Sequence, residues 1–167
     1  MKKYKIIALI GKSGAGKDYL LHRMCLDNPS YEPIVSCTTR PKREGETEGI
    51  DYHYLTDTEF LQQQYDGQFL ETSEFRKWHY GTRLKDLSTS HVNIGVFNPQ
   101  GIYSLLKLQH LVDLEVIYVY APDKVRLLRQ LNREEEPDCA EICRRFMTDE
   151  EDFRALDFVY IFYDNSI

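Results

Sequence analysis

The chain has 167 residues, and its 21 lysines and arginines against 27 aspartates and glutamates give a formal net charge of −6. This length suffices for one domain with a sizeable core, and the acidic balance argues against general binding to nucleic acid or to anionic membranes. No apolar run approaches the roughly 20 residues of a membrane span, and a glycine-rich segment directly after residue 10 argues against a cleaved signal peptide.

The predicted elements alternate between strands and helices. An apolar run at residues 4–10 predicts a buried parallel strand, and a helical pattern begins at residue 19 after a glycine-rich turn. Further strands are expected at residues 33–36, 52–55, 69–72, 78–81, 92–97, 114–120 and 158–162. Further helices are expected at residues 58–64, 102–110, 123–131 and 138–155. Alternation of this kind implies a mostly parallel sheet, which binds ligands at the carboxyl ends of its strands.

The glycine-rich turn is a candidate phosphate-binding loop. Residues 11–18 read Gly-Lys-Ser-Gly-Ala-Gly-Lys-Asp, which fits G-x-x-x-x-G-K-[ST] except at the last position. Glycines let the backbone N–H groups face phosphate oxygens, and Lys17 adds a full positive charge. The alternative is a glycine-rich turn with a solvated lysine. The predicted ATP-binding residues are Gly11, Ser13, Gly14, Ala15, Gly16, Lys17, Asp18 and Tyr19.

Asp18 stands where the motif has a hydroxyl that holds Mg²⁺. One interpretation is an acidic residue in the first turn of a helix, where the helix dipole favours it. The other is a carboxylate that holds Mg²⁺ directly or through water, because Mg²⁺ prefers oxygen ligands. The two interpretations remain open from the sequence, and Asp18 is the one metal-ligand candidate.

Further motifs follow in a fixed order. Residues 36–46 read Ser-Cys-Thr-Thr-Arg-Pro-Lys-Arg-Glu-Gly-Glu, and Gly-Ile-Asp-Tyr, Phe-Leu-Glu and Tyr-Gly-Thr stand at 49–52, 69–71 and 80–82. With the phosphate loop, this series resembles the guanylate kinase family from the first strand to about Arg145. The resemblance implies an α/β P-loop NTPase fold of three layers, with a parallel core sheet, an inserted region that binds a nucleoside monophosphate (NMP), and a helical lid. It divides the single domain into a core (1–35, 92–125 and 146–167), an NMP-binding insertion (36–91) and a lid (126–145).

The chemistry of these residues agrees with a monophosphate acceptor. Arg40 and Arg43 are three apart and can clamp one phosphate, and Tyr52 and Tyr80 can each donate a hydroxyl to it. A carboxylate such as Glu71 can accept from the N1–H and N2–H groups of guanine, whereas adenine would leave it unpaired. Without the other motifs, the arginines would be interpreted as a solvated basic patch and Glu71 as a surface residue. The predicted GMP-binding residues are Ser36, Arg40, Arg43, Glu46, Tyr52, Glu71, Tyr80 and Thr82.

Arginines that flank a charged break suggest a lid over the transferred phosphoryl group. By resemblance, Lys17, Arg129, Arg133 and Arg145 are the predicted catalytic residues; the alternative for each arginine is a solvated helix with i, i+4 pairs. The expected function is ATP-dependent phosphorylation of GMP or dGMP with Mg²⁺, without a nucleic-acid or membrane partner. The four cysteines form no C-x-x-C pair and are typical of a cytoplasmic protein.

The chain departs from the family pattern at several positions. In the phosphate-binding loop, Lys12 and Asp18 differ from the residues that are usual in the family. Asn98 lies in a stretch where the family has acidic residues, and the chain stops at Ile167 without the expected closing helix. Two alternatives therefore stay open. One is a P-loop kinase of a different (deoxy)nucleotide or small phosphate acceptor, and the other is a catalytically dead module that binds protein.

Overall fold

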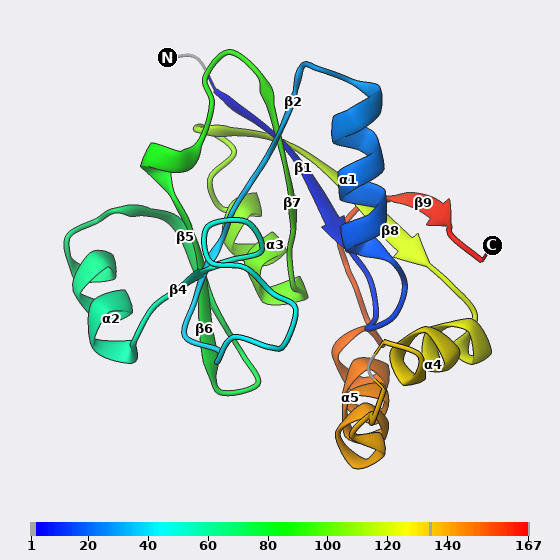
Figure 1. Ribbon diagram of the computed structural model, residues 1–167. Helices are drawn as coiled ribbons and strands as arrows, with labels where there is room; N and C mark the ends of the chain where they lie inside the picture. Colours follow the sequence, from blue (N-terminus) through cyan, green and yellow to red (C-terminus); the bar gives the residue numbers. More distant parts are fainter. Residues whose placement is uncertain (1–2, 134, 167) are drawn as a thin grey trace.

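The computed structural model describes residues 3–133 and 135–166, so residues 1–2 and 167 of the predicted core and residue 134 of the predicted lid lie outside the described residues. Figure 1 shows the arrangement of the elements. The strands are β1 (Tyr4–Ile10), β2 (Tyr31–Pro33), β3 (Cys37–Thr38), β4 (His53–Tyr54), β5 (Phe69–Phe75), β6 (Trp78–Arg83), β7 (Val92–Val96), β8 (Val112–Tyr120) and β9 (Ile161–Asp164). The helices are α1 (Lys17–Asp27), α2 (Asp57–Tyr65), α3 (Pro99–Leu106), α4 (Asp123–Leu131) and α5 (Cys139–Asp152), with a short 3₁₀ turn η1 (Leu84–Asp86).

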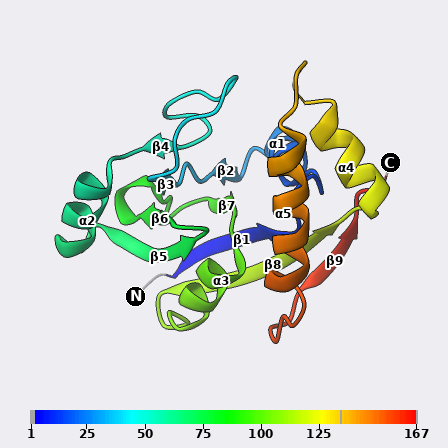
Figure 2. The same ribbon diagram turned by 90° about the horizontal axis from the view of Figure 1, so that it is seen from below.

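The core is a parallel sheet in the order β2-β7-β1-β8-β9, with β1 hydrogen-bonded to β7 and β8. Because successive side chains of a strand point to opposite faces of the sheet, β1 contributes side chains to two buried hydrophobic clusters. Ile6, Ala8 and Ile10 pack into the cluster that contains residues of α3, and Ile7 and Leu9 pack into the one that contains residues of α1. Figure 2 shows α1 on one face of this sheet and α3 on the other. These layers confirm the predicted α/β fold with a parallel core sheet.

A second, smaller sheet in the order β4-β3-β6-β5 is formed by residues of the predicted insertion. Its antiparallel β5–β6 hairpin lies beside α3, and Leu70 of β5 belongs to the same buried cluster as Ile6 of the core sheet. The small sheet is therefore joined to the core through a shared apolar interior. We call this four-stranded unit the acceptor sheet.

The two helices α4 and α5 follow β8 and gather near the loop between β1 and α1 (Figures 1 and 2). The side chain of Asp138 caps α5 by accepting from the backbone N–H of Glu141 at 3.0 Å, as expected at a helix start. The proposed lid boundary at residue 145 falls inside α5, so the division into core, insertion and lid stays a prediction. No described helix has the length and apolar character needed to cross a bilayer.

Three element predictions were wrong in position. The strand expected at 33–36 is two strands in different sheets, β2 ending at Pro33 and β3 beginning at Cys37. Helix α3 begins at Pro99 rather than at 102, because Asn98 Oδ1 accepts from Gly101 N–H at 2.8 Å and proline suits the first helical turn. The last strand lies at Ile161–Asp164 instead of 158–162, since its exposed aromatic run offers no buried face to fix the register.

Candidate active site

The loop between β1 and α1 has the backbone shape that its sequence predicted. Gly14 and Gly16 have φ angles of 79° and 91°, in the left-handed region that favours glycine. A Cβ atom at Gly14 would lie 2.5 Å from the backbone oxygen of Arg126, so a side chain there would collide with α4. The loop ends where α1 begins at Lys17, and the free N–H groups of a helix start form an anion-binding site.

Lys17 is held against this loop. Its Nζ donates to the carbonyl oxygen of Gly11 at 2.8 Å and to that of Lys12 at 3.3 Å. Burial lowers the pKa of the Lys17 amine, while the charges of Asp18 and Asp149 oppose that shift. The amine is thus positioned at the phosphate loop by backbone contacts and lies in the field of two carboxylates.

Asp18 and Tyr19 lie exposed on the first turn of α1. Burial raises the pKa of Tyr52, and the charge of Asp18 adds to that shift, so Asp18 acts electrostatically on a residue of the predicted acceptor site. Among residues 3–133 and 135–166, no group of at least three His, Cys, Asp or Glu side chains is placed to hold a metal ion. A single carboxylate is still compatible with Mg²⁺, which usually binds one or two carboxylates plus substrate phosphates. The metal role of Asp18 stays a prediction.

Arg40 and Glu46 form a buried ion pair in the predicted phosphate clamp. Arg40 Nη2 lies 2.8 Å from Glu46 Oε1, and the side chains are 5% and 7% exposed. Glu46 Oε2 also accepts from Arg43 N–H at 2.8 Å and from the Tyr54 hydroxyl at 2.7 Å. Burial would raise the pKa of Glu46, but these hydrogen bonds hold it at about 2. Glu46, predicted to bind GMP, therefore helps to shape the loop that carries Arg40 and Arg43, which we call the arginine loop.

Aromatic rings border the same clamp. The Arg40 guanidinium lies 5.3 Å from the centre of the Tyr52 ring, and the Tyr52 and Tyr80 rings are 6.1 Å apart. Ser36, another predicted acceptor residue, is partly exposed, and its carbonyl accepts from His53 N–H at 2.9 Å. The structure thus brings Arg40, Tyr52 and Tyr80 into one cluster, and the Arg40–Glu46 ion pair joins Glu46 to it.

Positive charges from the insertion and the predicted lid converge. Burial lowers the pKa of Arg43, and the nearby charges of Arg40, Arg145 and Arg133 lower it further, whereas Glu46 opposes them. Arg145 Nε donates to Glu141 Oε1 at 2.7 Å on its own helix. Arg133 is exposed. Like charges assembled in this way are costly unless an anion lies among them, which favours a phosphate-binding role for this face.

Arg129, also predicted to be catalytic, is placed against the phosphate loop. Its Nη1 donates to the carbonyl oxygens of Gly14 and Ala15 at 3.4 and 3.2 Å, and its Nη2 donates to that of Asn165 at 2.8 Å. These contacts support the shape of the loop. A direct role of Arg129 in phosphoryl transfer stays a prediction.

Glu71 is a buried carboxyl group with one unused oxygen. Thr82 Oγ1, across the β5–β6 pair, donates to Glu71 Oε1 at 2.8 Å. Glu71 Oε2 has no hydrogen-bond partner among the described residues, although only 6% of the residue is exposed to solvent. Burial raises the pKa of Glu71 to about 7, against the opposing hydrogen bonds from Thr82. An orphaned buried acceptor of this kind fits a ligand that donates hydrogen bonds.

Asn98 occupies the place where acidic residues were expected from the resemblance. Its Oδ1 caps α3, and its Nδ2 donates to Ser73 Oγ of β5 at 3.1 Å. Both ends of the amide are therefore used to join α3 to the acceptor sheet.

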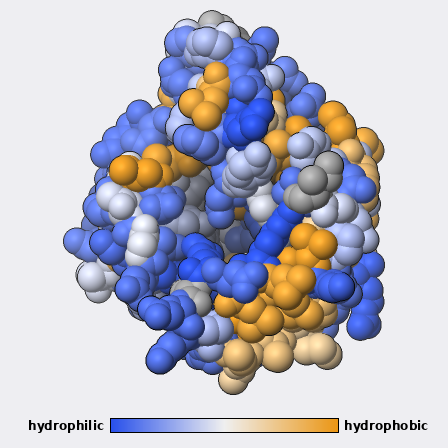
Figure 3. Space-filling model, turned by 45° about the vertical axis from the view of Figure 1, so that its right-hand side comes forward, coloured by the Kyte–Doolittle hydropathy of each residue, from blue (hydrophilic) through white to orange (hydrophobic). Residues whose placement is uncertain are grey.

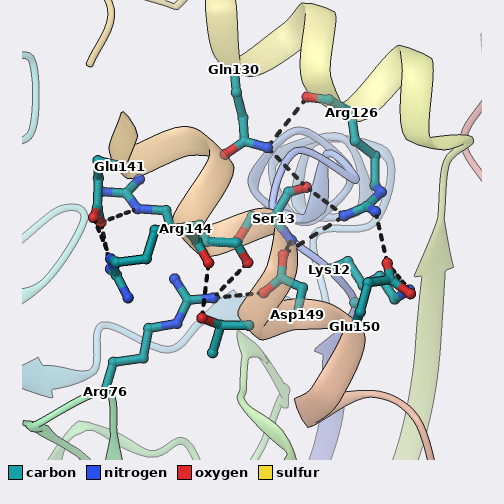
Figure 4. Close-up of polar contacts among 12 residues, drawn as sticks. Lys12, Ser13, Arg76, Arg126, Gln130, Glu141, Arg144, Asp149 and Glu150 are labelled. Carbon is teal, nitrogen blue, oxygen red and sulfur yellow. Dashed lines mark hydrogen bonds and ion pairs between the residues drawn. The ribbon is translucent and has the colours of Figure 1, made fainter. Parts of the chain in front are cut away.

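Sequence reasoning did not find a polar cluster behind the phosphate loop (Figure 4). Asp149 of α5 accepts from Ser13 N–H at 2.6 Å and from Arg76 Nη2 at 2.8 Å. Arg126, only 1% exposed, lies 3.4 Å from Glu150, which also pairs with Lys12 at 2.5 Å. The sequence placed Asp149 in an acidic stretch and Arg76 at a turn, and both patterns are typical of solvated residues. Nothing in the sequence indicated that these residues meet.

Hydrophilic side chains cover most of the face drawn in Figure 3, and they border most of the hollow near its centre. A separate cavity of about 740 Å³ lies between the amino-terminal parts of β1 and β8 and residues 157–161. None of the predicted site residues lines that cavity. The candidate active site is accordingly the region between the phosphate loop, the acceptor sheet and the helices α4 and α5.

Known proteins resemble the chain over most of its length. A family model described as guanylate kinase matches residues 3–167. The chain is 32% identical over 143 residues to the guanylate kinase of Gluconobacter oxydans, which covers 83% of this chain and 68% of that protein. It is 36% identical over 122 residues to the guanylate kinase of Bifidobacterium longum, which covers 70% of this chain. The chain spans 62% of the length of that second relative, so the match leaves part of it without a counterpart.

A solved structure, the guanylate kinase from Anaplasma phagocytophilum, matches with a TM-score of 0.65 and 20% identity over 100% of this chain and 79% of that one. At this identity the likeness concerns the fold, and it agrees with the parallel sheet and the phosphate loop described above. Two findings decide the classification. The family model matches residues 3–167, and the chain covers more than two thirds of the Gluconobacter oxydans relative. The chain belongs to the guanylate kinase family.

Proposed function

We propose that this protein transfers the γ-phosphoryl group of ATP to GMP or dGMP and so forms the nucleoside diphosphate. The observation that carries the proposal is the buried Glu71 carboxyl group, whose Oε2 has no partner among the described residues. Guanine presents N1–H and N2–H side by side, and a carboxylate can accept from both. Adenine presents an acceptor at N1, which would leave Glu71 unpaired at a cost of about 1–3 kcal/mol.

The phosphate of the acceptor is assigned to the arginine loop. Arg40 is pre-oriented by Glu46 and by the rings of Tyr52 and Tyr54. Arg43 is half-buried among other positive charges and is available to pair with an anion. A guanidinium group that is already held in place loses little rotamer freedom on binding, which favours a tight and directional phosphate contact.

The donor is assigned to the phosphate loop. Gly14 and Gly16 hold the backbone curve, and Lys17 brings its ammonium group to the loop. ATP, when bound, supplies the phosphoryl group, and Mg²⁺ neutralises part of its charge. Of the described carboxylates, Asp18 is the one that directly follows the loop lysine, and we assign it to the metal. The charges of Arg133 and Arg145 act on Arg43, so these residues lie near it. We assign them to stabilising the negative charge on the transferred phosphoryl group.

A panel of acceptors with ATP and Mg²⁺, followed by coupled ADP release, tests the proposal. GMP and dGMP are expected to be phosphorylated, and AMP, CMP and UMP are expected to be poor acceptors. Turnover of another monophosphate without turnover of GMP and dGMP would favour a kinase of a different acceptor. If no ADP is released with any of these acceptors, the protein is a module without catalysis.

The variant Glu71→Gln makes the panel specific to base recognition. The amide keeps the size of the carboxylate but turns one acceptor into a donor that faces the N–H groups of guanine. The efficiency ratio of GMP to AMP is expected to fall by about tenfold to a hundredfold. An unchanged ratio would show that Glu71 does not read the base.

The same proposal includes a cytoplasmic location and no nucleic-acid partner. All four cysteines are free thiols, as is usual in a reducing compartment. The net charge of −6 disfavours a polyanionic partner.

A further inference from the structure

Asp149 lies where three parts of the chain meet (Figure 4). Its side chain, on α5, is 3% exposed. Oδ2 accepts from the Ser13 N–H of the phosphate loop at 2.6 Å, and Oδ1 accepts from Arg76 Nη2, at the tip of the β5–β6 hairpin, at 2.8 Å. Arg126 of α4 approaches the same carboxylate, with Nη1 3.7 Å from Oδ2. One buried carboxylate therefore joins the phosphate loop, the acceptor sheet and the helices α4 and α5.

Arg76 reaches this carboxylate from the acceptor sheet. It forms the hairpin turn together with Lys77, and both residues have positive φ angles, 52° and 69°, which non-glycine residues seldom adopt. Its Nη2 also donates to the carbonyl oxygen of Arg145 at 3.2 Å, and its side chain is 11% exposed. A buried guanidinium with two partners on one helix holds the tip of the hairpin at a fixed place on α5.

The polar contacts of Arg76 run to α5 rather than to Glu71 or Arg43. Loss of the pair should therefore leave the acceptor contacts in place but release the acceptor sheet from the phosphate loop. Phosphoryl transfer depends on an in-line arrangement of two substrates, and a misplacement of about 1 Å can cost about a hundredfold in rate.

We propose that Arg76 and Asp149 are positioning residues whose ion pair fixes the acceptor sheet against the phosphate loop, and this proposal rests on the proposed phosphoryl transfer. Neither residue is among the predicted substrate contacts, and Asp149 touches the phosphate loop through the backbone N–H of Ser13. The ion pair sets the distance between the two sites and passes changes at Ser13 to the hairpin.

Steady-state kinetics of Arg76→Gln, Asp149→Asn and the double variant test the proposal. Each single change is expected to lower kcat by about tenfold or more, while the KM for GMP changes by less than about threefold. The double variant is expected to lie within about threefold of the slower single variant, because both changes remove one shared contact. Arg76→Lys keeps the charge, and it is expected to recover part of the kcat lost in Arg76→Gln.

Arg83→Gln is the matched control. The Arg83 side chain is also 11% exposed and is also ion-paired, to Asp86 at 2.6 Å, but its partner lies just after the acceptor sheet and not on α5. The kcat of Arg83→Gln is expected to stay within about twofold of the wild type, although its loss of thermal stability should be similar to that of Arg76→Gln. Equal losses of kcat in Arg83→Gln and Arg76→Gln, or an unchanged kcat in Arg76→Gln, would overturn the proposal.

A second readout does not depend on turnover. Trp78 is the single tryptophan of the chain and stands two residues after Arg76, in β6. Binding of ADP with Mg²⁺, checked by calorimetry, is expected to change the Trp78 emission in the wild type and in Arg83→Gln but not in Arg76→Gln. A response that persists in folded Arg76→Gln would contradict the coupling. If GMP is not phosphorylated, the proposed function fails, while the Trp78 response still decides whether the pair couples loop and hairpin.

Discussion

Thr82 donates a 2.8 Å hydrogen bond to Glu71 across the acceptor sheet and thereby uses one oxygen of a carboxyl group whose other oxygen is buried without a described partner. Burial raises the pKa of this carboxyl from an ordinary value of 4.5 to about 7. Because guanine offers two donors, it prefers the ionised form. The proposed recognition of guanine by Glu71 therefore depends on the protonation state of this carboxyl group.

The first prediction concerns GMP affinity and pH. With a pKa of about 7, Glu71 of the free protein is expected to be mostly protonated at lower pH, and GMP bound as proposed would displace that proton. The Kd for GMP is expected to rise by up to about tenfold for each pH unit below 7 and to be flat above it. Calorimetry at pH 7 in buffers of different ionisation enthalpy should detect proton release. A Kd that is constant between pH 6 and 8 would contradict this, and Glu71→Gln should show no such dependence.

The same pKa has a consequence for stability with the opposite sign. The folded state binds the Glu71 proton more tightly than the unfolded state does, so this contribution is fully present below about pH 4.5. It is lost as the pH rises to about 7, by at most about 3 kcal/mol. Urea unfolding of the wild type and of Glu71→Gln at pH 5 and pH 8 measures it. The difference in unfolding free energy between the two proteins should shift in favour of the variant at pH 8.

Much of the fold could be predicted because the central strands are buried on both faces. Side chains of β1 and β8 pack into both clusters, and Val92, Ile94 and Val96 of β7 pack into the cluster that contains residues of α1, so hydrophobic side chains mark these strands in the sequence. The edge strand β9 is exposed along its whole length, and its aromatic run fixed no register. The start of α3 depends on a cap and a proline rather than on apolar periodicity, which is why it was placed too late.

The candidate site divides in the same way. Local motifs marked the phosphate loop and the arginine loop, since their spacing along the chain reflects one compact turn each. The Arg76–Asp149 pair joins residues that are 73 positions apart. One lies at a hairpin tip and the other on a helix, and both stand in polar sequences typical of solvent-exposed segments. Only the tertiary packing brings them together, so no local pattern could reveal them.

The second prediction separates the donor site from the acceptor site. Lys17 contacts the carbonyl oxygens of the phosphate loop, whereas the predicted acceptor residues lie in the predicted insertion. Lys17→Ala is expected to lower kcat by about 10²–10³-fold because a preorganised charge is lost. GMP binding, measured by calorimetry, should be unchanged. Loss of GMP binding in a folded Lys17→Ala protein would contradict this division.

The third prediction concerns Glu46, which we interpret as the anchor of the arginine loop. Glu46→Gln leaves the buried charge of Arg40 without its counter-charge and should cost about 3 kcal/mol of unfolding free energy. The KM for GMP should rise more than kcat falls, because Arg40 loses its fixed orientation. Urea unfolding and steady-state kinetics measure the two effects.

Glu48→Gln is the control for Glu46. Glu48 lies in the same loop and accepts from Tyr54 N–H at 2.8 Å, but its side chain is 57% exposed. Its substitution should cost less than about 1 kcal/mol. Equal costs for Glu46→Gln and Glu48→Gln would show that the buried pair does not organise the loop.

The last prediction concerns Asp18, which directly follows the loop lysine and lies exposed at the start of α1. If its carboxylate takes part in holding Mg²⁺, Asp18→Asn should raise the Mg²⁺ concentration for half-maximal rate, because an ionic ligand is replaced by a neutral one. If it only favours the helix start, the Mg²⁺ requirement should stay and stability should fall by at most about 1 kcal/mol. We expect the first result, since a carboxylate beside a triphosphate repels it unless a cation lies between them. Mg²⁺ titrations of both proteins at fixed ATP decide between the two, and superimposable curves would exclude the metal role.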